Sequence, residues 1–197
     1  MTDSKRGPFK IVVGVDFENT GDEALANALR LAREHPNDEL HPVHVVKLAG
    51  DHHSAEQLAK ISRQMEDAAD NMRVRVHNIS EGLFPSEVWD QAMHFHVRLG
   101  DPAEALHQVA VDYDAHLLVV GTHARKGLKK LVLGSVAERL LEIAQLPVLV
   151  AREKHFEGMH ASDKPEDARE GESLREGFHR RETLSFGRRG GHISGLL

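Results

Sequence analysis

Residues 117–136 read LLVVGTHARKGLKKLVLGSV. An apolar strand runs from Leu117 to Val120 into Gly121, and nine residues separate Ala124 from the pair Gly134 and Ser135. A glycine turn that leaves a strand, followed by a glycine and a hydroxyl at a helix N-terminus, allows backbone N–H groups to surround an anion. The stretch therefore predicts a phosphate-binding loop between a strand and a helix of an α/β fold.

Strands and helices alternate along the rest of the chain, which is typical of a parallel sheet covered on both faces. Short apolar runs predict five strands, and apolar residues that recur every three or four positions predict four helices. The strands cover 11–15, 41–48, 94–99, 117–120 and a last run ending at 151, and the helices begin near 20, 54, 102 and 135. We expect a five-stranded, parallel, doubly wound sheet, that is, a Rossmann-like α/β sandwich.

Local signals set the ends of several elements. Thr20 and Glu23 have capping-box spacing, Ser54 precedes the longest helix, and Asp101 precedes a proline at the first helical position. In the second strand, the period of two places Val43 and Val45 on one face and His44 and Val46 on the other. Ligand contacts from one face of this strand must therefore come from alternate residues.

Composition indicates one domain with a tail. The 197 residues are 40% hydrophobic, enough for one good core. The chain has no cysteine, which excludes a disulfide scaffold and thiolate metal sites, and its formal net charge of −6 argues against a dedicated nucleic-acid binder. We divide the chain into a polar lead (1–8), the α/β domain (9–151) and a charged tail (152–197) that we expect to be mostly disordered and dispensable for folding and ligand binding. The polar start and the lack of a long apolar span lead us to expect a cytoplasmic protein.

The loop resembles the pattern of the universal stress protein family: Gly, two residues, Gly, nine residues, then Gly and Ser or Thr. Ala124 stands where the second glycine belongs. The resemblance implies a five-stranded α/β sandwich, usually dimeric, with one subgroup that binds ATP. It also implies that the acid ending the first strand lies by the nucleoside, that a valine of the second strand contacts adenine, and that the loop holds the phosphates. By position these roles fall on Asp16, Val45, Gly121, Thr122, His123, Ala124, Gly134, Ser135 and Val136.

The resemblance implies an adenine nucleotide, ATP with Mg²⁺, bound by a regulatory protein of the stress response. Two alternatives stay open: a nucleotide-free dimeric interaction module, favoured by the methyl group of Ala124, and a slow ATPase or phosphotransferase. The loop offers no evident general base, and the chain has no Walker loop, so we predict no catalytic residue. Asp16 could equally cap a turn, and the basic side chains at 125, 126, 129 and 130 either pair with phosphates or remain solvated.

Two further predictions concern the histidines and the last strand. His94 and His96 share one face of a strand, and His52 and His53 lie in a loop, but spacing reveals no third ligand, so we expect structural or solvated roles and no metal. The apolar residues Val148 to Ala151 form a short edge strand with nothing after it to cover it. We therefore expect a homodimer through this edge and no membrane partner.

Overall fold

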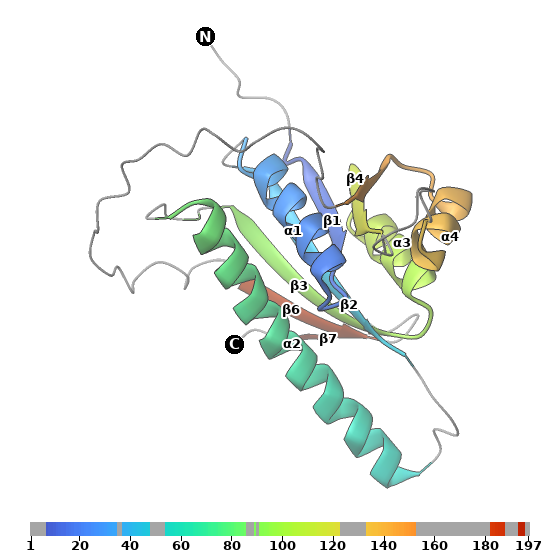
Figure 1. Ribbon diagram of the computed structural model, residues 1–197. Coiled ribbons are helices and arrows are strands. Elements are labelled where there is room, and N and C mark those ends of the chain that lie inside the picture. The colour runs from blue at the N-terminus through green and yellow to red at the C-terminus, as the bar shows by residue number, and fades with distance from the viewer. Residues whose placement is uncertain are drawn as a thin grey trace.

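The computed structural model describes residues 7–34, 37–47, 54–85, 89, 91–122, 133–152, 182–187 and 193–195 (Figure 1). The elements follow one another as β1 (Lys10–Gly14), α1 (Asn19–Ala32), β2 (Glu39–Val46), α2 (Ala55–Leu83), β3 (Ala92–Leu99), α3 (Pro102–Asp112), β4 (Leu117–Gly121), α4 (Ser135–Ile143), β5 (Val148–Ala151), β6 (Glu182–Gly187) and β7 (Ile193–Gly195). Within these residues, no helix combines the length and the apolar character that crossing a bilayer requires.

The strands form one sheet in the order β5-β4-β1-β2-β3-β6-β7. All neighbouring pairs among β1 to β5 are parallel, which confirms the predicted five-stranded α/β sheet. Helices α1 and α2 cover one face, and α3 and α4 cover the other (Figure 1). The doubly wound arrangement follows because each strand-to-strand connection carries a helix across a face of the sheet.

Two apolar layers fill the space between the sheet and the helices. Leu25 of α1 and Met72 of α2 pack with Phe95 on one face, whereas Leu106 of α3 and Leu140 of α4 pack on the other. The predicted alternation along β2 is confirmed, because Val43 and Val45 belong to the α3/α4 layer and Val46 belongs to the α1/α2 layer.

The sheet continues beyond the five predicted strands. β6 pairs in parallel with β3, from Met93 beside Glu182 to Arg98 beside Gly187, and β7 pairs antiparallel with β6. We expect residues 152–197 to be mostly disordered, and β6 and β7 are two short strands within them that the sequence did not predict. The reason for the difference is tertiary: the segment is too sparse in apolar residues to build a core, but the open edge of β3 supplies backbone partners for a six-residue strand.

The helix-start signals had mixed outcomes. Ser54 Oγ accepts the N–H of Gln57 at 3.2 Å, and Asp101 Oδ1 accepts the N–H of Glu104 at 3.0 Å, as expected for N-caps. The predicted capping box at Thr20 is wrong, because α1 begins at Asn19 and its N-cap residue is Glu18, whose side chain makes no capping bond. The carboxylate of Asp16 accounts for this early start, since it binds the N–H of Glu18 and shapes the turn into the helix.

Candidate functional site

The order in which successive strands are placed in the sheet reverses between β1 and β4. From β1 it winds outward through β2 and β3, and then returns to place β4 on the other side of β1. Ligands of open α/β sheets bind beyond the carboxyl ends of the strands at such a switch point. Asp16 follows β1 and Gly121 ends β4, so both predicted residues lie at this edge.

Asp16 is exposed, but its carboxylate already has partners within its own turn. Oδ1 accepts the N–H of Glu18 at 2.9 Å, and Thr20 Oγ1 donates to Oδ2 at 3.5 Å. A Cβ at Gly21 would collide with this carboxylate, so the first turn of α1 packs directly on it. The neighbouring Phe17 has a φ of 62°, which is uncommon for a side chain of this size. Asp16 is thus held in a tightly built turn that presents it at the strand end.

Gly121 and Thr122 attach neighbouring elements to the end of β4. A Cβ at Gly121 would overlap the backbone carbonyl of Thr20, so glycine allows the start of α1 to approach β4 closely. Thr122 is buried, and its N–H donates to the carbonyl of Ala151 at 3.1 Å. Both residues therefore have a structural role at the predicted site.

Helix α4 presents its N-terminus at the same edge. Gly134 is the N-cap residue and makes no side-chain capping bond, while its carbonyl accepts the N–H of Glu138 at 3.0 Å. Ser135 is the first helical residue and is exposed, and Val136 is half-buried against the α3/α4 layer. The free N–H groups of the first turn and the helix dipole together favour an anion at this position.

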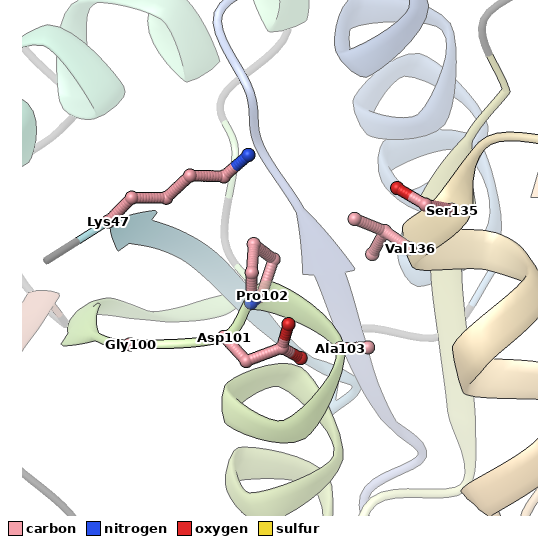
Figure 2. A pocket seen from close by; sticks show the side chains of 7 residues that line it. All are labelled: Lys47, Gly100, Asp101, Pro102, Ala103, Ser135 and Val136. Atoms are coloured by element: carbon pink, nitrogen blue, oxygen red, sulfur yellow. The ribbon is translucent and has the colours of Figure 1, made fainter. Parts of the chain in front are cut away.

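A cavity of about 440 Å³ opens between the N-termini of α3 and α4. Figure 2 shows Ser135 and Val136 on one side, Lys47 extending toward the cavity from the end of β2, and the start of α3 beneath. This volume falls in the range of about 300–1,000 Å³ that small-molecule sites occupy. The described lining residues are Lys47, Gly100, Asp101, Pro102, Ala103, Ser135 and Val136.

Sequence reasoning found two of these lining residues, Ser135 and Val136. It missed Lys47 and the 100–103 segment as site residues, although both directly follow strands, and the rule of the carboxyl ends applies to them as it does to Asp16. Val45 packs in the same apolar layer as Val136 and Ala103, next to the cavity lining. His123, Ala124 and the predicted basic side chains between 125 and 130 lie outside the described residues.

One histidine and one ion pair shape the electrostatics around Asp16. The Nδ1 of His44 donates to the carbonyl of Val15 at 2.7 Å, and its ring lies 4.4 Å from that of Phe17. Burial lowers the pKa of His44, although the Val15 carbonyl and Asp16 act in the opposite direction. His44 is thus kept neutral next to the acid that ends β1.

The ion pair joins the two helices on the same face. Arg75 of α2 donates from Nε and Nη2 to the two carboxylate oxygens of Asp22, at 2.5 and 2.7 Å. Hydrogen bonding to Asp22 raises the pKa of Arg75, so the guanidinium stays charged. This two-pronged contact anchors the first turns of α1, the same turns that Asp16 and Gly121 contact.

The comparison with known proteins agrees with this architecture. A profile described as the universal stress protein family matches residues 9–152. The chain belongs to the universal stress protein family. Universal stress protein YxiE of Bacillus subtilis is 28% identical over 151 residues, covering 73% of this chain and 98% of YxiE. Universal stress protein MJ0531 of Methanocaldococcus jannaschii is 28% identical over 145 residues, covering 73% of this chain and 81% of the relative.

Solved structures of universal stress proteins share the fold. UspA from Lactobacillus plantarum superimposes with a TM-score of 0.56 at 20% identity, covering 75% of this chain and 99% of UspA. A universal stress protein crystallised in complex with cAMP gives a TM-score of 0.54 at 19% identity, with coverage of 75% and 99%. These likenesses confirm the predicted α/β architecture, and the match over residues 9–152 confirms the predicted family.

Proposed function

We propose that this universal stress protein is a cytoplasmic regulatory protein of the stress response that binds an adenine nucleotide, ATP with Mg²⁺, at the carboxyl edge of its sheet. The observation that carries the proposal is the cavity between the N-termini of α3 and α4, which Ser135 and Val136 line. A family member of the same fold has been crystallised with cAMP, which is an adenine nucleotide. That complex supports the same class of ligand here.

The cavity lining fits a phosphate group. Ser135 offers a hydroxyl and the N–H groups of the first turn of α4, and Lys47 offers a flexible ammonium group across the cavity. Asp101 would repel a bare phosphate, but a carboxylate oxygen is the ligand type that Mg²⁺ prefers. In this assignment Ser135 and Lys47 hold the phosphates, and Asp101 faces the Mg²⁺ ion. The bound Mg²⁺ ion partly neutralises the charge of the phosphates.

The nucleoside is assigned to the neighbouring strand ends. Asp16 would accept hydrogen bonds from the ribose hydroxyls, and Val45 would give adenine an apolar contact next to Val136. The backbone of Gly121, Thr122, His123, Ala124 and Gly134 would complete the loop around the phosphates. Asp101 is the sole carboxylate among the described lining residues, and it already caps α3, so we expect binding without rapid hydrolysis.

The test is a thermal melt with and without ligand, followed by calorimetry. Millimolar ATP with Mg²⁺ should raise the melting temperature more than AMP does, because the loop and the N-terminus of α4 bind phosphates and ATP offers three of them rather than one. A ligand at about 100 times its dissociation constant adds about 2.7 kcal/mol of stability. Ser135→Ala should weaken ATP binding roughly tenfold by removing a hydrogen bond to a charged group, and Ala124→Gly should tighten it by removing a methyl group from the loop.

Ser54→Ala is the matched control, because Ser54 caps α2 and is not among the lining residues. Its ATP affinity should equal that of the wild type. No thermal shift with ATP and Mg²⁺ would contradict the proposal and favour the alternative that Ala124 supports, a nucleotide-free dimeric interaction module. Steady release of phosphate that depends on the bound nucleotide would instead favour the slow ATPase.

A further inference from the structure

Three ligand-type side chains meet at the edge of the sheet opposite to the nucleotide cavity. Glu39 begins β2, His41 lies two residues further along, and His94 is near the start of β3. One side-chain ligand atom from each residue lies within 4.8 Å of the others. The cavity follows the carboxyl ends of β2 and β3, whereas this cluster lies near their amino ends, so the two sites are separate.

His41 is the central member of the cluster. Its side chain is fully buried, and its Nε2 has no hydrogen-bond partner among the described residues. Glu39 Oε2 lies 3.5 Å from this nitrogen and 3.9 Å from Nε2 of His94. A carboxylate oxygen therefore stands between two imidazole nitrogens at separations too long for normal hydrogen bonds.

A second histidine orients the His41 ring. Nδ1 of His41 and Nε2 of His96 are 3.0 Å apart, and the rings of His41 and Tyr113 pack with their centroids 4.7 Å apart. When His41 Nδ1 donates to His96, the lone pair of His41 lies on Nε2, which faces Glu39. Metal-binding histidines use the same arrangement, in which the second ring nitrogen donates a hydrogen bond that sets the tautomer.

We propose that Glu39, His41 and His94 bind a divalent cation of the Zn²⁺ class. Two imidazoles and one carboxylate suit Zn²⁺ and Co²⁺, and three protein ligands leave one coordination position open. Metal–ligand bonds of about 2.0–2.2 Å in a tetrahedron place the ligand atoms roughly 3.3 Å apart. The separations of 3.5 and 3.9 Å exceed this spacing by about 0.2 and 0.6 Å, and the widest separation in the cluster, up to 4.8 Å, has to shorten by about 1.5 Å, which side-chain rotation of the partly exposed Glu39 and His94 can supply.

The surroundings allow the ion to enter and keep the His41 ring deprotonated. The side chains of Glu39 and His94 are 25% and 26% exposed, whereas that of His41 is buried, so solvent reaches the cluster from one side. Burial, with smaller effects of His94 and Lys10, lowers the pKa of His41 to about 3. The charge of Lys10 opposes a cation, but its ammonium donates to the carbonyl of Tyr113 at 3.0 Å and is held there.

The test uses the full chain, stripped of metal with a chelator and then titrated with Co²⁺ or Zn²⁺. Co²⁺ bound by the cluster should give the visible absorption of a four-coordinate site with one ion per chain, and calorimetry should give the same stoichiometry for Zn²⁺. Glu39→Gln and His94→Gln should each weaken binding by about 100-fold or more, because even supporting residues change metal affinity by 10–100-fold. Lys10→Met should tighten binding by removing the opposing charge.

Two variants control for the many other histidines of the chain. The double variant His52→Gln/His53→Gln and the single variant His77→Gln should retain the wild-type affinity and spectrum. Glu39 and His94 are partly exposed, so their variants should fold, and thermal melts of the metal-free proteins verify this. Binding that is absent in the wild type, unchanged in Glu39→Gln and His94→Gln, or lost only in the loop double variant would overturn the proposal.

Discussion

Gly121 shows how a residue predicted for ligand binding can be required by packing. Because a Cβ at this position would overlap the carbonyl of Thr20, Gly121→Ala should lower the free energy of unfolding by about 1–3 kcal/mol, the usual cost of overpacking. Gly82 of α2 is the matched control: an added Cβ there would meet open space, so Gly82→Ala should stabilise by up to about 1 kcal/mol. Chemical denaturation of both variants measures the difference, and equal stabilities would contradict the packing role.

His44 makes stability depend on pH. Its pKa in the folded state is lowered by burial, so the unfolded chain binds a proton at this residue at a higher pH than the native protein does. The free energy of unfolding must therefore fall as pH drops below the unfolded pKa of about 6.5, and this loss ends below the folded pKa. His44→Asn keeps a side-chain N–H donor but does not titrate, so it should lose less stability than the wild type between about pH 7.5 and about pH 5.

The matched control for this measurement is His77→Asn on the exposed surface of α2. It should follow the wild-type pH profile. The pKa values of His41 and His94 are also lowered mainly by burial, so both residues add to the loss of stability at low pH. This contribution is the same in the wild type and in both variants. Denaturation in a chelating buffer removes any effect of bound metal. Identical pH profiles for His44→Asn and the wild type would show that His44 does not contribute.

At the scale of elements, β5 is an edge strand that pairs only with β4 among the described residues. Unpaired strand edges favour association with another chain, so the homodimer through Val148–Ala151 stays a prediction. A lysine on the edge should oppose pairing. Val150→Lys and Leu149→Asp should therefore shift the protein from dimer to monomer at micromolar concentration in light scattering, with helix content retained by circular dichroism. Val74→Lys, on the exposed face of α2, should remain dimeric.

A monomeric wild type would exclude this interface directly. If Val150→Lys and Leu149→Asp both stay dimeric, a different surface forms the dimer. Leu149 is half-buried against the α1/α2 layer and Val150 against the α3/α4 layer, so both variants also test packing, and the circular dichroism control applies to both.

At the scale of the whole molecule, β6 changes what we expect from removing the tail. The sequence alone predicts that a chain ending after Lys154 is as stable as the full protein. Six register pairs join β3 to β6, and cross-strand pairs contribute about 0.2–1 kcal/mol each, partly offset by the entropy of ordering the segment. Truncation after Lys154 should therefore cost about 1–3 kcal/mol and increase self-association through the opened edge of β3.

Truncation after Gly187 is the matched control, because it keeps β6 and removes β7. It should retain most of the stability that the longer truncation loses. Nucleotide affinity should be the same in both, since no described lining residue of the cavity lies after Val136. Unchanged melting temperatures in both truncations would support the prediction from sequence that residues 152–197 are dispensable.

The sequence by itself determined five strands, four helices and the edge of the sheet at which the proposed nucleotide site lies. Hydrophobic period, helix caps and glycine positions act over a few residues, so the five parallel strands, the caps at Ser54 and Asp101, and the placement of Asp16 and Ser135 could all be predicted. The capping box at Thr20 was wrong because Asp16 caps the turn that leads into α1, the alternative role that its position in the sequence also allowed.

Only the tertiary structure decided which distant residues share a site. β6 exists as a strand because β3 offers it an edge, and Lys47 joins Ser135 at one cavity because β2 and α4 meet at the same edge of the sheet. His94 meets Glu39 and His41 for the same reason, since β2 and β3 lie side by side in parallel register. Contacts of this kind depend on strand order, and no local pattern in a single sequence determines the order in which strands pair.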